Sequence, residues 1–392
     1  MPPVRDRTTS LRQLALLFFR LGTIAFGGPA AHIAMMEDEV VRRRHWLARD
    51  KFLDLLGATN LIPGPNSTEM AIHIGYLRAG WPGLLVAGIC FILPAALIVF
   101  ALAWAYVRFG SLPQTARILY GVKPVIIAVV LQALWGLGRA AVKTRFLGLV
   151  GLAAVVASFL RSNELLVLLG AGILLAGVRM FAGLWKSTNG KRGALFFPIS
   201  FSALIQTATG AGVASGVSIG LVPLFLFFLK VGSVLFGSGY VLLAFLRGDL
   251  VERWHWLTNS QLLDAVAAGQ ITPGPVFTTA TFIGYVLAGP KGAIVATVGI
   301  FLPAFLFVAL SGPLVPRIRR SATAGAFLDG VNVASLALMI VVTYELGKAA
   351  MVDLPTIALG VVSAIVLFRW RVNSVWLVLC GALIGFVVTS FN

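Results

Sequence analysis

The stretch Asn60-Leu61-Ile62-Pro63-Gly64-Pro65-Asn66-Ser67-Thr68-Glu69 decides how this chain folds, because no α-helix can continue through it. Its two prolines remove two backbone N–H donors, and each pushes the preceding residue out of the helical region. Proline suits the first position of a new helix, so we predict a half-helix that starts at Pro65 or Asn66. A second stretch of this kind follows 210 positions later, Gln270-Ile271-Thr272-Pro273-Gly274-Pro275-Val276-Phe277-Thr278-Thr279.

The rest of the chain repeats itself around these two stretches. Phe26-Gly27 and His45-Trp46-Leu47 also recur at a spacing of 210. After one deleted residue, Gly75-Tyr76 recurs at 209, and Gly138-Arg139 is matched at 209 by Gly347-Lys348. A register held over such a length indicates a duplication. We predict a first repeat over residues 1–182 and a second over 218–392, joined by a linker at 183–217 that contains a further apolar segment.

Composition places the chain in a membrane. Of its 392 residues 59% are hydrophobic and 11% charged, whereas soluble domains carry about 25% charged residues. Apolar stretches such as Trp81–Val107, Gly121–Val142 and Leu165–Phe181 are long enough for the roughly 30 Å hydrocarbon core. The alternation typical of a membrane β-barrel is absent from the sequence. We predict an all-α polytopic membrane protein.

The net charge of +17 is spread over short clusters between apolar segments. This distribution is typical of loops that face anionic lipid and the cytoplasm, and it excludes a nucleic-acid-binding surface. The arginine-rich loop at Arg42–Lys51 has a mixed-charge counterpart, while the bias is reversed between Arg161–Glu164 and Arg369–Arg371. Equivalent loops facing opposite sides favour inverted repeats with discontinuous or re-entrant helices.

The two breaks are the predicted anion site. Broken backbone is costly in hydrocarbon unless it lines a cavity, and a half-helix start offers free N–H groups and a positive dipole end to an anion. A structural kink without a ligand is the alternative interpretation. The candidate anion-binding residues are Gly27, Gly28, Asn60, Pro63, Gly64, Pro65, Asn66, Ser67, Thr68, Gly237, Ser238, Gln270, Thr272, Pro273, Gly274, Pro275, Thr278 and Thr279.

Four ionisable residues in apolar surroundings have candidate roles. Glu69 and His73 lie one turn apart and are candidates for proton coupling, with helix capping as the alternative for Glu69. Arg20 and Lys230 occupy equivalent positions and are candidates to neutralise a bound anion, with snorkelling to the interface as the alternative. We expect no metal site and no cofactor, since the four histidines and two cysteines show no ligand spacing.

The motifs closely resemble those of the chromate ion transporter (CHR) family, in its long, bidomain form. The resemblance rests on Phe26-Gly27-Gly28-Pro29, the residues His32–Met36, the stretch Arg42–Trp46 and Pro63–Glu69, and it covers the whole chain. It implies a multi-pass inner-membrane carrier, not an enzyme, that expels chromate from the cytoplasm and confers chromate resistance, energised by the membrane gradient. The second copy departs from the pattern at Ser238-Gly239 and at Thr279, so the halves are not expected to play equal roles.

Three alternatives to chromate export stay open at this point. Sulfate has the shape and charge of chromate, so the protein could carry sulfate or another oxyanion. A channel would conduct without coupling to a gradient. A membrane-embedded enzyme would need a nucleophile or metal constellation that the sequence lacks. The expected partners are the oxyanion and the lipid bilayer, with a homodimer left open.

Overall fold

The computed structural model describes residues 10–26, 28–60, 62–110, 112–160, 163–186, 219–235, 241–319, 321–370 and 372–390. The elements of the first repeat are α1 (Leu11–Ile24), α2 (Gly28–Glu37), the π-helical η1 (Asp38–Arg43), α3 (Arg49–Thr59), α4 (Asn66–Phe109), α5 (Pro113–Ala141), α6 (Arg145–Phe159) and α7 (Glu164–Lys186). Those of the second are α9 (Leu221–Val234), α10 (Leu242–Phe245), η3 (Leu246–Arg253), α11 (Asn259–Ile271), η4 (Val276–Thr278), α12 (Thr279–Arg319), α13 (Ala322–Ala350), α14 (Leu354–Trp370) and α15 (Ser374–Val388).

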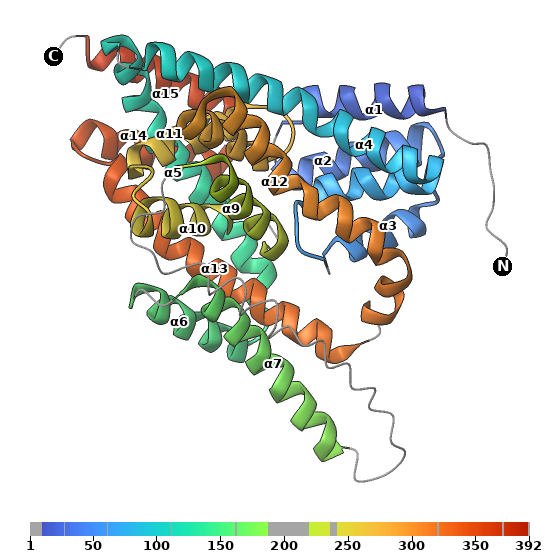
Figure 1. Cartoon of the computed structure of the whole chain (residues 1–392). Helices are drawn as coiled ribbons and strands as arrows, with labels where there is room; N and C mark the ends of the chain where they lie inside the picture. Colours follow the sequence, from blue (N-terminus) through green and yellow to red (C-terminus); the bar gives the residue numbers. More distant parts are fainter. Residues whose placement is uncertain are drawn as a thin grey trace.

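The two repeats have the same order of elements, as the duplication predicts (Figure 1). Each begins with a 14-residue helix and continues through a π-helical segment, a short helix, the proline break and one very long helix. The predicted break after Phe26 is present, since α1 ends at Ile24 and α2 begins at Gly28 with a φ of 78°. The predicted extra crossing in the linker lies outside the described residues.

The long helix of each repeat is a hairpin rather than one rod. In α4 the backbone leaves the helical region at Ala79 and Gly80, and Gly80 has a φ of 61°. The arms then pack so closely that a Cβ added to Gly83 would lie 2.2 Å from the carbonyl oxygen of Gly75. The equivalent kink in α12 falls at Ala288 and Gly289. Glycine is needed at both contacts, because only a bare backbone allows this approach.

Helix α3 and the first arm of α4 together form a re-entrant segment, which enters and leaves on one face. The arm runs from Asn66 to Ala79, about 20 Å at 1.5 Å per residue. Near its end Arg78 donates from Nη1 to the Trp46 carbonyl oxygen (3.0 Å), at the level where α3 begins. Tyr76 and Trp81 stack edge to face at the tip, with centroids 5.6 Å apart, as aromatic residues do at a membrane interface. Helix α3 therefore enters from the same face to which the arm returns, and the proline break lies deep between them.

The central helices show that the repeats are inverted. Gly138 of α5 lies beside Leu336 of α13, and Ile127 lies beside Gly347, so these two equivalent helices run antiparallel. Both are among the five described helices that are long and apolar enough to span a membrane. Equivalent spans can run in opposite directions only if the axis that relates them lies in the membrane plane. The chain is therefore a multi-pass helical protein built from two inverted repeats.

Each repeat also completes the other. Helix α5 packs against α14 and α15 of the second repeat, and α13 packs against α6 and α7 of the first. Small residues mediate both contacts. A Cβ on Gly121 would lie 1.9 Å from the Gly381 carbonyl oxygen, and one on Gly330 would lie 2.4 Å from that of Ala171. Helices of both repeats therefore surround the two breaks.

The hairpin contact predicts a sharp difference between two glycine substitutions. Gly83→Ala puts a methyl group against the Gly75 carbonyl and should destabilise the protein by about 1–3 kcal/mol, the usual cost of overpacking. Gly136→Ala, on α5, meets no atom within 4 Å and should stabilise by about 0.5–1 kcal/mol through helix propensity. Thermal unfolding of both variants in one detergent measures the difference. Equal melting temperatures would contradict the close approach of the two arms.

Candidate functional site

The two Pro-Gly-Pro loops are held by reciprocal hydrogen bonds across the repeats. The Gly64 N–H donates to the carbonyl oxygen of Leu235 (2.7 Å), and the Gly274 N–H donates to that of Ala25 (2.9 Å). Leu235 and Ala25 are the residues at which α9 and α1 end. Both loop glycines have positive φ, 138° and 90°. Each proline break therefore satisfies the end of the first helix in the other repeat.

The first break starts a helix where the sequence predicts it. Pro65 is the N-cap and α4 begins at Asn66. Ser67 in the first turn contacts His32 of α2, with 3.2 Å between its Oγ and the ring Nδ1, while Nε2 lies 3.0 Å from the Ala25 carbonyl oxygen. A carbonyl can only accept, so Nε2 carries the ring proton, Nδ1 is the acceptor, and Ser67 donates to it. His32 thus connects the first break to the Ala25 carbonyl that also holds Gly274.

Glu69 lies over the first break without a protein partner. Its side chain is 0% exposed, and neither carboxyl oxygen has a hydrogen-bond partner. A Cβ added to Gly64 would lie 2.3 Å from its Oε1, so the carboxyl group rests directly on the loop. His73, one turn further along the arm, is also buried, and its Nε2 is unpartnered. A buried carboxylate with no donor is expensive, and this makes the pair suited to taking up and releasing a proton.

The other polar groups of the first break also lie together. Asn66 donates from Nδ2 to Oδ1 of Asn60 (2.8 Å), while the Asn66 Oδ1 is buried without a partner. Thr68 is fully buried, and its Oγ1 has no partner either. The first break therefore holds several unsatisfied polar atoms around Glu69.

The second break has a different local structure. It opens with the short 3-10 turn η4, and the arm that follows is one residue shorter than its counterpart. All three threonine hydroxyls donate to nearby carbonyl oxygens: Thr272 to Ala268 (2.7 Å), Thr278 to Pro275 (2.8 Å) and Thr279 to Val276 (2.8 Å). Their protons are therefore engaged in this conformation, and their oxygen atoms can still accept hydrogen bonds.

A polar cavity of about 240 Å³ lies beside the second break. Four residues that the sequence singled out line it together: Gly28, Gln270, Thr272 and Gly274. The complete lining is Ala25, Gly28, Val129, Gln132, Gly269, Gln270, Thr272, Gly274, Val276, Val372, Asn373 and Ser374.

Three polar residues of this lining were not anticipated, Gln132 of α5 and the pair Asn373-Ser374. Asn373 caps α15 by accepting from the Val375 N–H (3.1 Å), so this helix starts at the cavity wall. An asparagine before an apolar run is a helix-start signal that could have been recognised in the sequence. Its position beside Gln270 could not, because it depends on how α15 packs against α5.

Arg20 and Lys230 each form an ion pair with an acid of their own repeat. Arg20 lies 3.7 Å from Glu39 of η1, and Lys230 lies 2.7 Å from Asp249 of η3. These partners are themselves equivalent, at a spacing of 210. That either cation neutralises a bound anion stays a prediction.

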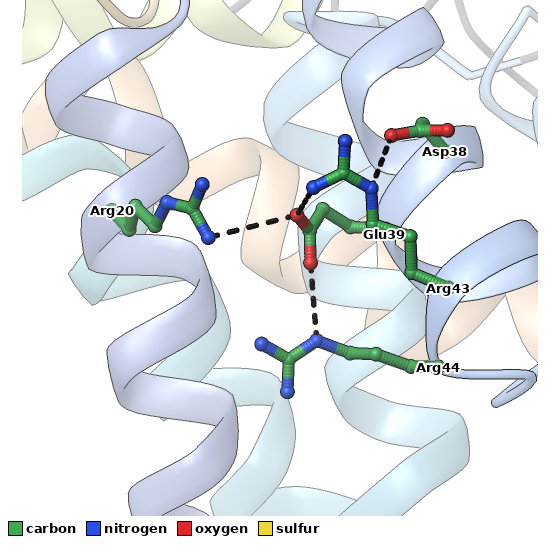
Figure 2. A network of polar contacts seen from close by, with 5 residues as sticks. All are labelled: Arg20, Asp38, Glu39, Arg43 and Arg44. Atoms are coloured by element: carbon green, nitrogen blue, oxygen red, sulfur yellow. Dashed lines mark hydrogen bonds and ion pairs between the residues drawn. The ribbon is translucent and has the colours of Figure 1, made fainter.

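Glu39 is the centre of the cluster in the first repeat, as Figure 2 shows. Arg43 and Arg44 reach its two carboxyl oxygens at 3.3 and 3.2 Å, and Arg43 also pairs with Asp38 at 2.7 Å. In the second repeat Arg253 pairs with Asp249 and approaches Glu164 of α7 at 4.0 Å. The arginine-rich loop predicted from the sequence is therefore largely neutralised by its own acids.

A further ion pair joins the repeats on the helices that line the cavity. Lys123 of α5 lies 3.3 Å from Oδ1 of Asp264 on α11 and donates to the Ser260 hydroxyl (2.6 Å). Tyr106 of α4 donates to the other carboxyl oxygen of Asp264 (3.0 Å). Asp264 lies in the second turn of α11, which begins at Asn259. Lys123 was not singled out from the sequence.

Three of the candidate anion-binding residues, Gly27, Gly237 and Ser238, lie outside the described residues.

Comparison with known proteins agrees with the duplication. The family model described as "Chromate transporter" matches the chain twice, over residues 12–176 and 222–386. A "Chromate transport protein" of Cupriavidus metallidurans is 35% identical over 388 residues, covering 97% of this chain and 94% of the relative. A "Probable chromate transport protein" of Synechococcus elongatus is 32% identical, with coverage of 91% and 89%.

A third relative, a "Chromate transport protein" of Pseudomonas aeruginosa, is 31% identical over 97% of this chain and 92% of its own length. No solved structure matches the chain. The two family matches together span both repeats, and the three relatives are more than 30% identical over nearly the full length of the chain. The chain belongs to the chromate transporter family.

Proposed function

We propose that this protein is a secondary transporter that exports chromate from the cytoplasm across the inner membrane and so confers chromate resistance. The observation that carries the proposal is the polar cavity at the second break. Amide and hydroxyl side chains and one helix start converge there inside an apolar bundle. Such a site suits a small oxyanion that must lose its water without leaving hydrogen bonds unmade.

The cavity lining offers donors but no formal cation. Gln270 can donate two N–H groups, and Gln132 can donate one besides the bond it gives to the Leu367 carbonyl (3.1 Å). The start of α15 adds the positive end of a helix dipole, roughly half an elementary charge. Chromate and sulfate share their charge and shape, so these donors serve both anions, and sulfate transport remains the alternative activity.

A continuous set of contacts supports coupling between the first break and the cavity. Ser67, two residues before Glu69, donates to His32, and His32 donates to the Ala25 carbonyl oxygen. Ala25 and Gly274, which this carbonyl also holds, both line the cavity. A change in the charge of Glu69 would act on the first turn of α4 and through His32 on the cavity wall. Glu69 is therefore our candidate for the coupling residue, with His73 beside it.

Transport direction is tested with inverted membrane vesicles that contain the protein. Energised vesicles should accumulate chromate, and collapse of the proton gradient should stop the uptake. Parallel flux measurements with sulfate separate the two oxyanions. Conductance that persists without a gradient would indicate a channel instead. Energised vesicles that take up no chromate above those lacking the protein would rule out export.

The coupling role predicts a selective loss in Glu69→Gln. The amide keeps the size of the side chain but cannot exchange a proton, so chromate should still bind while gradient-driven flux falls to background. The matched control is Thr279→Val at the equivalent position of the second repeat, which should keep its proton dependence. The measurement is flux against external pH together with equilibrium binding. If Glu69→Gln transports with the wild-type pH profile, Glu69 is only a structural cap.

The location of the anion predicts unequal effects at two equivalent positions. Gln270→Leu removes a cavity donor and should weaken chromate binding about 10- to 150-fold, because a hydrogen bond to a charged group contributes about 1.5–3 kcal/mol. Asn60→Leu changes the equivalent residue of the first break, which lies outside the cavity lining, and should have a much smaller effect. Chromate dissociation constants of the purified variants provide the comparison. A larger loss in Asn60→Leu would move the anion to the first break.

A further inference from the structure

An apolar groove of about 1020 Å³ lies between α5 and α13, away from the breaks. Its two walls come from equivalent positions of the repeats: Leu131 corresponds to Ile340 and Trp135 to Tyr344 in the register, at a spacing of 209. Ile357 and Phe368 of α14 close one side. The large apolar side chains of the walls are well exposed; Trp135 is 60% and Tyr344 54% exposed. The groove therefore opens toward the hydrocarbon of the bilayer.

Each end of the groove carries one cation stacked on one aromatic ring. Arg139 lies over Trp135, 5.9 Å from the ring centroid, and Lys348 lies over Tyr344 at 5.0 Å. Because α5 and α13 are antiparallel, the two cations lie at opposite ends, with apolar residues between them. This sequence of cation, aromatic ring and hydrocarbon matches the layers of one lipid leaflet.

The two ends differ in charge. Lys348 lies 3.6 Å from Glu345, and Glu345 also contacts Arg247 at 3.6 Å, so the charge of Lys348 is balanced within the protein. Arg139 forms no ion pair with any acid among the described residues, and its guanidinium group lies over the Trp135 ring. Only the Arg139 end therefore leaves a positive charge for a ligand.

We propose that this groove binds one anionic phospholipid, with the headgroup phosphate on Arg139 and an acyl chain along Leu131 and Ile340. An arginine with its fork of N–H donors is well suited to a phosphate group. The acyl chain fills the space between two equivalent helices and contacts both repeats at once. The bound lipid thereby stabilises the α5–α13 pair, which lies at the centre of the molecule.

The test compares two lipids with identical acyl chains, phosphatidylglycerol and phosphatidylcholine, on the purified full-length protein by native mass spectrometry. Wild-type protein should retain phosphatidylglycerol in preference. Arg139→Gln should lower that preference about tenfold, as expected for the loss of one charge-assisted contact. Lys348→Gln should change it less than about twofold, because its charge is already paired. Arg145→Gln, an exposed cation outside the groove, should leave it unchanged.

Two further arms identify the occupant. Gly138→Leu adds a side chain inside the groove, where its nearest neighbour is Leu336 at 3.6 Å, and should lower binding of both lipids. Leu131→Phe on the same wall repeats this arm if Gly138→Leu expresses poorly. Glycerol 3-phosphate, which lacks acyl chains, should not displace the lipid.

Four results would overturn the proposal. The first is an Arg139→Gln variant with the wild-type lipid preference, and the second is a preference lost equally in Arg145→Gln. Displacement by glycerol 3-phosphate would assign Arg139 to a free phosphate. A lipid-free dimer that Gly138→Leu dissociates would assign the groove to a second copy of the chain.

Discussion

Two hydrogen bonds between the repeats, from Gly64 to Leu235 and from Gly274 to Ala25, are the interactions on which the rest of the structure depends. Four helix ends lie deep in an apolar protein, and each unsatisfied backbone group there costs several kcal/mol. The two repeats avoid part of this cost, because each break donates a hydrogen bond to a helix end of the other repeat. Neither repeat can satisfy its own broken helices, so the inverted pair is the smallest unit in which both breaks are satisfied.

The two breaks share this arrangement of the backbone but differ in their first turns and side chains. In the second copy the first turn after the break is the 3-10 turn η4, and the threonine hydroxyls donate to local carbonyl oxygens. The first copy keeps a regular helix start and carries Glu69 on top of the loop. In the proposed mechanism this difference would let the first break change its charge while the second contacts the anion, with His32 between them.

Much of this organisation could be predicted from the sequence, because it depends on residues that lie close together in the chain. Proline positions predict where helices must stop and restart, and a register of 210 and then 209 predicts that both copies do so alike. Lys123–Asp264 and the cavity wall at Gln132 and Ser374 could not be predicted in this way. They depend on α5 packing against helices of the other repeat, and nothing in the sequence around Lys123 signals its partner.

The outcome for Arg20 shows a second limit of sequence reasoning. Its partner Glu39 lies 19 positions along the chain, on the π-helical η1 that follows the break. The sequence located the cation correctly and gave no means to find the acid. Once one of the ion pairs Arg20–Glu39 and Lys230–Asp249 is known, the spacing of 210 predicts the other.

The side chains also limit how symmetrical a transport cycle can be. In an inverted-repeat carrier the two repeats would exchange environments when the site changes its access, provided that their contacts were equivalent. Here Glu69 is matched by Thr279, His73 by Phe282, and Glu164 by Asn373. The contact of Arg253 with Glu164 across the repeats therefore has no counterpart at Asn373, which instead caps α15 at the cavity. The two repeats have the same order of elements, but their charges differ, so the inward- and outward-facing states of the proposed carrier would differ in energy.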